Sequence, residues 1–468
     1  MRSKSEAQCR FKFFQKSNLK ETNQYYQKYQ AISSILDQSP EIIDAVHQDL
    51  EKPLKYASAK DSEGRRCKFT TSTVLRILIL MFAEGWSLRE TTIRIDTAHF
   101  FREFVGIYDR PMMNYSTLCN LKNAIRDETW KLINRLLARS AAEGEKISGE
   151  TTRIDTTAVE TNIHYPTDSS LLWDVYRVLA RFIKQARELD RESVGDKRAH
   201  NKSTKKLFTK INRTAGRKDS AESLKDPYED LIARVSGIMA WSQSVAVNLR
   251  NRADKIGGLC GDSAARGLAE EIDNCLLLGA QVVDQAQRRI FQGEKVPNEE
   301  KIFSIFEPHT ELLKRGKARR NIEYGHMIQI QQSPEKFITD YGVFEKKPVE
   351  HTLLDPAVEN HKEVFGKYPD TFSADKGYYE RRAVEQLKQK VKNVAIGKKG
   401  KRTEEETARE HSPEFREAQR FRAGIEGSIS FLKRALRLAR CLAKGFEHYC
   451  STVGATIFAH NLVVLARC

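Results

Sequence analysis

The sequence predicts an α/β protein, in which a mixed sheet carries a large helical insertion and follows a helical N-terminal region. Three observations lead to this fold class. Residues 1–150 place apolar side chains at helical spacing almost throughout. A strand-like segment occurs at 153–159, and strand signals return only from residue 322. Between them, at about 168–300, the pattern is helical again.

The size and charge of the chain limit what it can be. Its 468 residues allow several hydrophobic cores and exclude one small module. Lys and Arg total 79 against 63 Asp and Glu, a net charge of +16. This excess favours a polyanionic partner, with nucleic acid ahead of an anionic membrane, although a merely soluble basic protein has the same composition.

The cysteines and the apolar runs favour a soluble, cytoplasmic protein without a membrane partner. The longest hydrophobic run, Val74 to Phe82, contains Arg76 and is too short to span a bilayer, and residues 1–10 do not look like a signal peptide. No Cys-x-x-Cys pair or zinc spacing occurs, so we expect reduced, mostly structural thiols. The cysteines are Cys9, Cys67, Cys119, Cys260, Cys275, Cys441, Cys450 and Cys468.

Residues 1–150 are expected to form a helical DNA-binding region. Leu75, Leu78, Ile79 and Phe82 share a helix face, and the segment 87–90 (SLRE) has the form of a capping box that opens the next helix. This pair is a helix-turn-helix candidate. The helix after Asn114 could present Lys122 and Arg126 to a duplex, but a plain helical bundle explains the pattern equally well, and recognition residues stay unassigned.

The predicted insertion at 168–300 contains the densest positive region of the chain. Such a run is usually a solvated face, but in a basic chain it is an equally good track for DNA phosphates. We single out Lys205, Lys206 and Lys210 as DNA-binding candidates. The whole run comprises Lys197, Arg198, Lys202, Lys205, Lys206, Lys210, Arg213, Arg217 and Lys218.

After the insertion the predicted elements alternate, so that the sheet resumes and is flanked by helices. The strongly charged segment 397–419 is predicted to be a loop with at most marginal helix, leading to a helix that carries Glu426. Steps of four and seven residues place Arg422, Glu426 and Lys433 close together on one face of this helix, where ordinary intrahelical pairing is the default interpretation. Without the insertion, this order is compatible with an RNase H-like core. The predicted elements are a hairpin of strands 322–330 and 337–344, a helix near 356–366, a strand at 371–374, a helix at 379–390 and a strand at 391–396.

Three carboxylates lie in these elements. Asp155 is in the first strand, Asp375 ends the strand at 371–374, and Glu426 is on the last predicted helix. A single acid in so charged a chain is usually a surface residue. Acids at two strand ends and on a packed helix could instead hold two divalent cations roughly 3.5–4 Å apart for phosphoryl transfer.

Several peptides together resemble the DDE transposases of bacterial insertion sequences, with the ISNCY-type group as the candidate subgroup. The segment 155–172 (DTTAVETNIHYPTDSSLL) is similar to their first-aspartate segment, and 374–378 (ADKGY) to the second. Arg422, Glu426 and Lys433 match the Arg-x3-Glu-x6-Lys signature, but Gln419 stands where many relatives have a tyrosine. The resemblance covers roughly residues 65–468, and its long gap from Asp155 to Asp375 places the insertion after the first strand.

The resemblance implies a site and a mechanism. Asp155 would contact both of two Mg²⁺ or Mn²⁺ ions, and Asp375 and Glu426 would each complete one side. Arg422 and Lys433 would hold the DNA backbone or the scissile phosphate. A water would cut at the element's end, and the freed 3′-hydroxyl would attack target DNA. The partners implied are double-stranded DNA, as element ends and target, and further copies of this chain in a dimer or higher oligomer, in the cytoplasm at the nucleoid of a bacterium.

Three residues that follow the first aspartate in the sequence have alternative roles. Thr156 and Glu160 are close enough in sequence to support the site, although Glu160 is equally well a surface residue. His164 is more readily a structural or DNA-facing residue than a ligand, because Mg²⁺ sites seldom use imidazole.

Three other functions remain open. A metal-dependent nuclease or resolvase on the same core would cut without joining. A DNA-binding regulator derived from a transposase would only bind. A tyrosine or serine recombinase is disfavoured, because no nucleophile stands out and the three acids would be unexplained.

Overall fold

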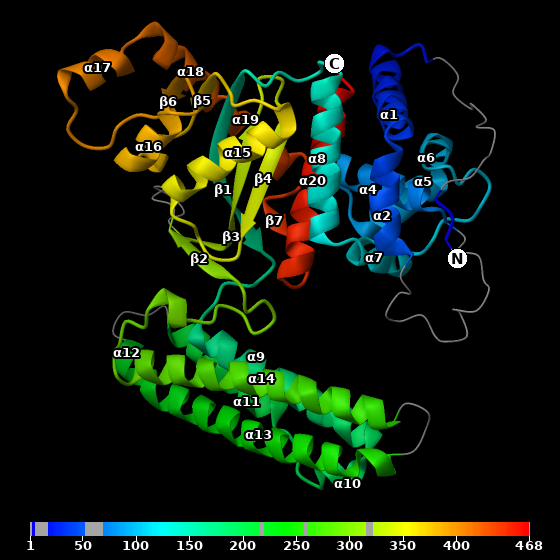
Figure 1. Ribbon diagram of the computed structural model, residues 1–468. Helices are drawn as coiled ribbons and strands as arrows, with labels where there is room; N and C mark the ends of the chain where they lie inside the picture. Colours follow the sequence, from blue (N-terminus) through cyan, green and yellow to red (C-terminus); the bar gives the residue numbers. More distant parts are fainter. Residues whose placement is uncertain are drawn as a thin grey trace. The chain divides into compact units, whose positions relative to one another are not determined.

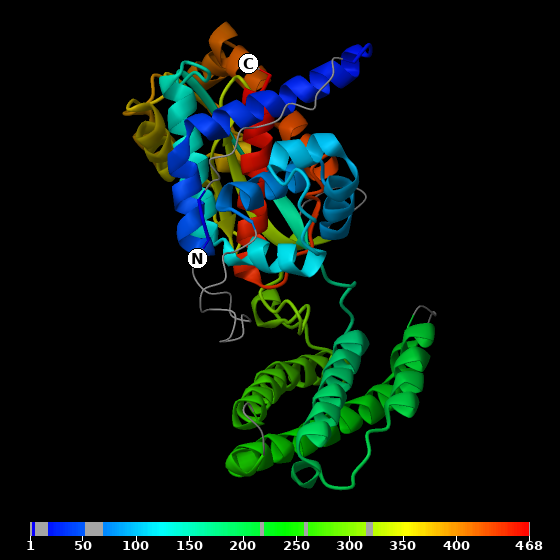
Figure 2. The same ribbon diagram turned by 90° about the vertical axis from the view of Figure 1, so that its right-hand side faces the viewer.

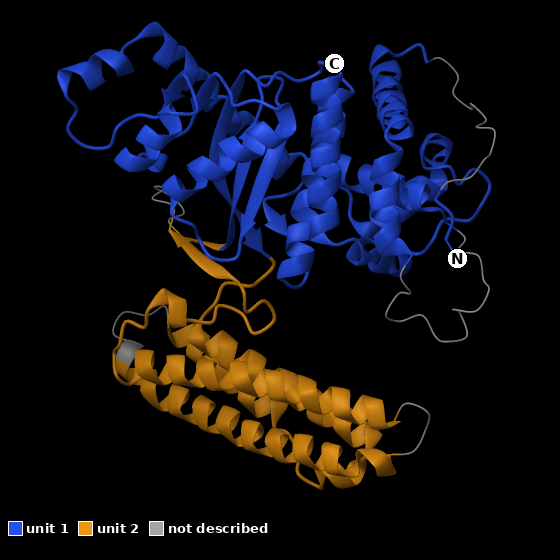
Figure 3. Ribbon diagram, viewed as in Figure 1, with its two compact units in different colours: residues 1–161, 325–468 blue, residues 162–324 orange. Residues whose placement is uncertain are grey.

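The computed structural model describes residues 2–4, 17–51, 69–215, 220–256, 261–314 and 322–467. The chain divides into two compact units (Figure 3). Unit 1 comprises 1–161 and 325–468, and unit 2 comprises 162–324. The assignment of 1–150 as a DNA-binding region, and of 151–468 as a catalytic domain interrupted at about 168–300, stays a prediction.

Strand β1 (Thr151–Thr161) lies in the middle of the sheet (Figure 1). On one side it pairs antiparallel with β3 (Ile322–Gln332), and on the other parallel with β5 (Thr371–Ser373). Beyond these, β4 (Ile338–Phe344) is antiparallel to β3, and β6 (Asn393–Ala395) is parallel to β5. The predicted mixed sheet, including its hairpin, is therefore confirmed.

Two short strands were not predicted from the sequence. Strand β2 (Glu311–Lys314) lies beside β3 in the strand order, and β7 (Arg440–Cys441) pairs parallel with the end of β1. At two to four residues, both are too short to show an alternating pattern.

Helices cover both faces of the sheet because side chains alternate along β1. Ile154 is buried in one core with residues of α15 (Leu354–Phe365) and α16 (Arg381–Lys388). Val159 is buried in another core with residues of α19 (Ile425–Arg434) and α20 (Phe446–Leu465). The predicted helices at 356–366 and 379–390 are confirmed to within about two residues.

The N-terminal helices share one hydrophobic core with α20, which includes Trp130 and Phe458. In Figure 2, α20 runs beside these helices. They are α1 (Lys20–Gln38), α2 (Pro40–Leu50), α4 (Thr71–Ala83), α5 (Leu88–Thr97), α6 (His99–Val105), α7 (Tyr115–Ala124) and α8 (Asp127–Glu143).

The predicted helix-turn-helix geometry is present in α4 and α5. The two helices are bent by 112° across a four-residue break, and Ser87 and Glu90 form the predicted capping box. The two cations proposed for a basic face near α7 have different surroundings. Lys122 is partly buried, and burial lowers its pKa. The Arg126 side chain is 56% exposed, although it also pairs with the buried Asp49 at 2.7 Å. Both alternatives, a basic face and a plain helical bundle, stay open.

The prediction of a loop at 397–419 is wrong, since α17 (Glu404–Glu410) and α18 (Pro413–Ala423) lie there. Local caps explain both helices. Thr403 and Glu406 form a capping box, and the Ser412 hydroxyl caps α18 while Pro413 occupies its first turn. The charged composition concealed these start signals.

Unit 2 is a helical bundle in which α9 (Asp168–Leu189), α13 (Lys225–Arg252) and α14 (Gly261–Ile290) pack against one another (Figure 2). Its core is formed largely by Leu, Ile, Val and Ala side chains of these helices. Shorter helices complete it, namely α10 (Arg191–Val194), α11 (Asn201–Thr214) and α12 (Ser220–Ser223).

Within the described ranges, no single helix is long and apolar enough to cross a membrane. Helices α4 and α5 pass the length and composition test only as a bent pair, and most of α4 is buried in the core. In the part of the chain that the structure describes, Cys119, Cys275 and Cys450 are free thiols. The predictions for Cys9, Cys67, Cys260 and Cys468 lie outside the described residues.

Candidate active site

Asp155 lies on the sheet face that α19 covers. Its partner in β3 is Ile330, which is buried in the core with Ile425 of α19. The Thr156 N–H donates to Asp155 Oδ1 at 2.7 Å, and an Arg422 guanidinium nitrogen lies 4.0 Å from Asp155 Oδ2. The Asp155 side chain is 19% exposed, so it is reachable yet largely desolvated.

The parallel pairing of β1 and β5 explains why Asp375 lies near Asp155. Arg153 is the register partner of Ser373, and each aspartate follows two residues later. Asp375 precedes the short 3-10 helix η4 (Lys376–Tyr378), where the chain leaves the sheet. Two strand ends thus bring together two acids that are far apart in the sequence.

Glu426 is in the first turn of α19 and exposed. Arg153 fixes where this helix begins. Its guanidinium donates to the Phe421 carbonyl and lies against Gly424, where a Cβ atom would stand 2.6 Å from Arg153 Nη1. The Phe421 carbonyl also accepts from the Gly424 N–H at 3.1 Å, and α18 ends at this point.

This break corrects one sequence prediction. Arg422, Glu426 and Lys433 were expected on one continuous helix, but Arg422 ends α18, whereas Glu426 and Lys433 belong to α19. Arg422 still points toward the acids. Its Nε is buried and makes no hydrogen bond with the described residues, so this donor is available to a ligand.

The three acids interact electrostatically. Burial raises the pKa of Asp155 to about 6; the Thr156 N–H and Arg422 oppose this rise, while the charges of Asp375 and Glu426 add to it. No hydrogen bond or ion pair engages the Asp375 or Glu426 carboxylate within the described residues. Mutual repulsion of this kind is relieved by a cation.

Oxygen donors on two strand ends and a helix are the ligand type that Mg²⁺ and Mn²⁺ prefer. The donor chemistry therefore fits a divalent cation. In this structure the carboxylates of Asp155, Asp375 and Glu426 are not arranged around a common metal position. No group of three or more His, Cys, Asp or Glu in the described residues is placed to hold a metal ion. The roles of Asp155, Asp375 and Glu426 as ligands stay a prediction.

Gln419, which replaces the tyrosine of many relatives, has a structural role. Its amide donates to the carbonyls of Ala395 at 2.6 Å and Ala374 at 3.3 Å. It thereby ties α18 to the ends of β5 and β6, immediately before Asp375. The substitution supplies a double contact with the backbone that carries the aspartate.

The residues near Asp155 have different surroundings. Thr156 contributes its backbone N–H to Asp155. Glu160 forms an ion pair with Arg440 at 2.8 Å, which favours a structural role. His164, in unit 2, lies 3.4 Å from Asp174, in keeping with the structural alternative.

Sequence reasoning missed Arg153 and its partner. Arg153 Nε and Nη2 both donate to Gln332 Oε1, at 3.0 and 2.5 Å, so its position is fixed by two bonds. A signal was present, because a charged residue in a strand two positions before Asp155 must lie on the same face.

The basic run lies largely on α11. Thr204 and Ile211 are buried, and Phe208 stacks on Trp173 with ring centroids 6.1 Å apart. The opposite face is exposed, has no acid between 201 and 214, and makes no ion pair within the described residues. It carries Lys202, Lys205, Lys206, Lys210 and Arg213, whereas Arg217 and Lys218 lie outside the described residues.

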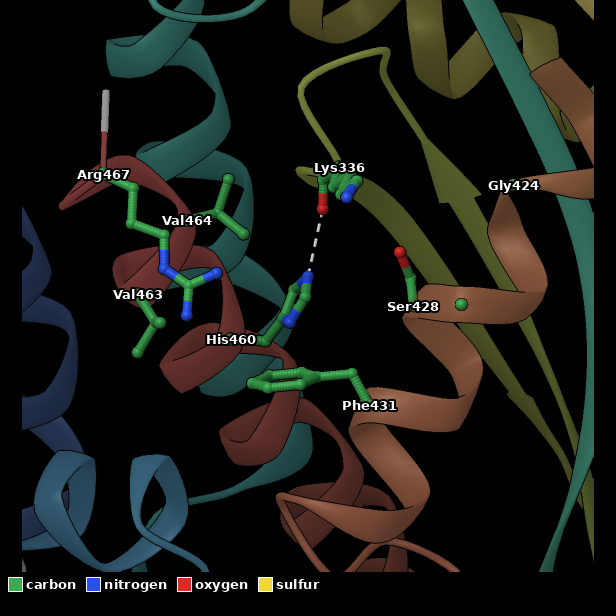
Figure 4. A pocket seen from close by; sticks show the side chains of 9 residues that line it. Lys336, Gly424, Ser428, Phe431, His460, Val463, Val464 and Arg467 are labelled. Atoms are coloured by element: carbon green, nitrogen blue, oxygen red, sulfur yellow. Dashed lines mark hydrogen bonds between the residues drawn. The ribbon is translucent and has the colours of Figure 1, made fainter.

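A cavity of about 250 Å³ lies between α19, α20 and the β3–β4 turn (Figure 4). Its wall includes Phe431, Val463 and His460, whose Nε2 lies 3.0 Å from the Lys336 carbonyl oxygen. None of the three acids lines this cavity, so it is separate from the carboxylate site.

In the comparison with protein families, residues 305–462 match the model of the transposase DDE domain. This match includes Asp375, Arg422, Glu426 and Lys433 but begins after Asp155. The comparison with curated proteins found no match, and neither did the comparison with solved structures. The resemblance to DDE-type transposases is thereby confirmed, while bacterial origin and the ISNCY-type group stay predictions.

Proposed function

We propose that this chain, whose residues 305–462 match the transposase DDE domain, is a DNA transposase. It would bind the ends of an insertion sequence, cleave there and transfer the 3′-hydroxyl ends to target DNA. The observation that carries this proposal is the parallel register of β1 and β5, which brings Asp155, from outside the matched segment, to the strand end that Asp375 follows within it. We assign the sheet to an RNase H-like core on its mixed pairing around β1.

The residues of this chain perform the positioning. Asp155, Asp375 and Glu426 would hold two Mg²⁺ or Mn²⁺ ions. When bound, such ions activate an attacking oxygen and stabilise the leaving oxygen of a phosphodiester. Arg422 offers its buried Nε and a positive charge beside Asp155, which suits a non-bridging oxygen of the scissile phosphate.

Additional cations would hold the DNA. Lys433 lies on the same helix as Glu426, two turns further along, where it would contact the phosphate backbone near the cleaved bond. Lys205, Lys206 and Lys210 would bind backbone phosphates through the exposed face of α11. Since two element ends must be held together, the active form would be a dimer or higher oligomer on DNA.

The test is cleavage and joining of a labelled duplex that bears the element's own ends. We expect cutting and joined products in Mg²⁺ or Mn²⁺ and none in EDTA. Glu426→Gln should abolish both reactions but keep DNA binding, because the substitution removes a charge from an exposed side chain. Glu417→Gln, an exposed acid of α18, is the matched control and should remain active.

The products separate the proposed function from its rivals. Metal-dependent cutting without joining would identify a nuclease instead. Binding without cutting in the wild type would identify a regulator. Loss of folding in Glu426→Gln would mean that Glu426 is a structural acid and would contradict its assignment to the site.

A further inference from the structure

A fourth carboxylate lies beside Asp375. Glu350 begins the short 3-10 helix η3 (Glu350–Leu353), and its side chain lies against Gly377 in η4, which follows Asp375. A Cβ atom at Gly377 would stand 2.4 Å from Glu350 Oε2 and 3.7 Å from Asp375 Oδ2. The two carboxylates therefore border the same small space, which exists because residue 377 has no side chain.

Glu350 is half-buried, and no hydrogen bond or ion pair engages its carboxylate within the described residues. Its neighbours in sequence differ, since Asp355 and Glu359 of α15 both pair with Lys390 at 2.6 Å. Even Lys399, which reaches η4, donates to the Gly377 carbonyl at 2.6 Å rather than to an acid. An unpaired acid here is unusual in a chain with 79 basic residues.

A buried hydroxyl group lies near the same carboxylates. Tyr378 is 1% exposed, and its oxygen, although beside the Thr156 side chain, makes no hydrogen bond of ordinary geometry with the described residues. The charges of Asp155, Glu350 and Asp375 all act on this hydroxyl, so it lies within electrostatic reach of the three acids. A buried hydroxyl without a bonded partner near three carboxylates points to a ligand among them.

We propose that Glu350 is a fourth acidic residue of the active site, which binds a divalent cation together with Asp375. This inference rests on the proposed function, because it assigns Glu350 to the cation held there. Gly377 is the residue that admits the Glu350 carboxylate to the site. A fourth carboxylate on the Asp375 side adds an oxygen ligand where one aspartate would otherwise act alone.

The test is calorimetric titration of the full-length protein with Mn²⁺ in the absence of DNA. Glu350→Gln keeps the shape of the side chain and should weaken Mn²⁺ binding at one site by about tenfold or more. Gly377→Ala should have a similar effect by displacing the Glu350 carboxylate, while all four acids remain. Glu345→Gln, an exposed acid five residues away, should bind Mn²⁺ as the wild type does.

The outcomes separate this inference from the proposed function. Wild-type affinity in both Glu350→Gln and Gly377→Ala, with weakened binding in Asp375→Asn, would overturn the role of Glu350 alone. Absence of Mn²⁺ binding in the wild type would overturn the cation site and the role of Glu350 with it. Thermal unfolding without metal checks the fold, and Glu350→Gln should unfold no lower than the wild type because it removes a repulsive charge near Asp375.

Discussion

Arg153 organises the site at the scale of single residues. It shares a strand face with Asp155, is fixed by two hydrogen bonds to Gln332, and donates to the carbonyl that precedes the break between α18 and α19. Its guanidinium also makes a cation–π contact with Phe421 near the end of α18, with Cζ 4.4 Å from the ring centroid. Burial lowers its pKa to about 10, so it remains charged at neutral pH.

A single methyl group at the helix break should therefore disturb the site. In Gly424→Ala the new Cβ would stand 2.6 Å from Arg153 Nη1, and Arg153 cannot move without losing its bonds to Gln332. We expect a loss of about 1–3 kcal/mol in the free energy of unfolding. The rate of cleavage should fall by about tenfold or more, because Glu426 lies only two residues after Gly424. A 1 Å displacement of a group at an active site can lower the rate by about 100-fold.

Gly427→Ala on the same helix is the control for this prediction. A Cβ at Gly427 would meet no atom within 4 Å, and alanine is the better helix former by about 1 kcal/mol. Urea unfolding of both variants, with cleavage assays alongside, makes the comparison. Equal behaviour of the two variants would show that the contact between Arg153 and Gly424 is unimportant.

Among single residues, local context in the sequence led to Asp155, Asp375 and Glu426 as site candidates, and their roles stay predictions. It did not indicate Arg153, Gln332 or Glu350, because their surroundings depend on which strand or loop lies opposite. The expectation that Arg422, Glu426 and Lys433 share one helix failed for the same reason. The break at Gly424 lies against Arg153, which is far away in the sequence.

At the scale of elements, periodic patterns predicted well and composition predicted poorly. Strands with alternating apolar residues and long amphipathic helices were found where expected. The charged segment 397–419 was predicted to be a loop from its composition, yet short capping motifs start α17 and α18 within it. Such caps are each worth about 1 kcal/mol, which is enough to order a helix that packs on neighbouring residues.

The exposed face of α11 gives a prediction at this scale. Replacing Lys205, Lys206 and Lys210 together by Gln should weaken DNA binding and reduce the salt dependence of the binding constant. If each lysine contacts one phosphate, the slope of log K against log salt should fall by about 2.7. Fluorescence anisotropy at several salt concentrations measures both quantities.

The control for α11 removes the same charge elsewhere in unit 2. Lys184, Lys225 and Lys255 are exposed or partly exposed, and Lys184 and Lys225 already pair with glutamates. Their replacement by Gln should change the slope little. A similar change in both triple variants would mean that only net charge matters, and that α11 is a solvated face.

At the scale of the whole molecule, the order of the chain hides the site. Strand β1 pairs with β3 and β5, although all of unit 2 lies between β1 and most of β3 in the sequence. The family match begins at residue 305 and therefore omits the first aspartate, which the sheet register brings near Asp375. Sequence patterns can locate strands but cannot measure such a register.

Two buried histidines give unit 1 a pH dependence of its own. His361 is 2% exposed and His460 is 4% exposed, and burial lowers the pKa of each to about 4. The unfolded chain takes up protons near pH 6.5, whereas the folded form resists them until about pH 4. Stability should thus be complete above about pH 6.5 and fall toward pH 4, by about 3 kcal/mol for each histidine.

The measurement is urea unfolding at about pH 7 and about pH 4.5. His361→Gln and His460→Gln keep a donor for the carbonyls of Gly149 and Lys336, which the two rings now contact. The double variant should lose much less stability on acidification than the wild type. Equal losses in the two proteins would assign the acid sensitivity to other groups.

Asp155, Asp375 and Glu426 come from distant parts of the chain, and the proposed function requires them to hold the same pair of cations. Bound Fe²⁺ in place of Mg²⁺, with ascorbate and peroxide, generates radicals that cut the nearest backbone, and mass spectrometry locates the cuts. We expect cuts near all three residues, suppressed by excess Mg²⁺ and lost in Asp155→Asn. Cuts confined to one segment, or cuts that persist in Asp155→Asn, would show that the three acids do not share a cation site.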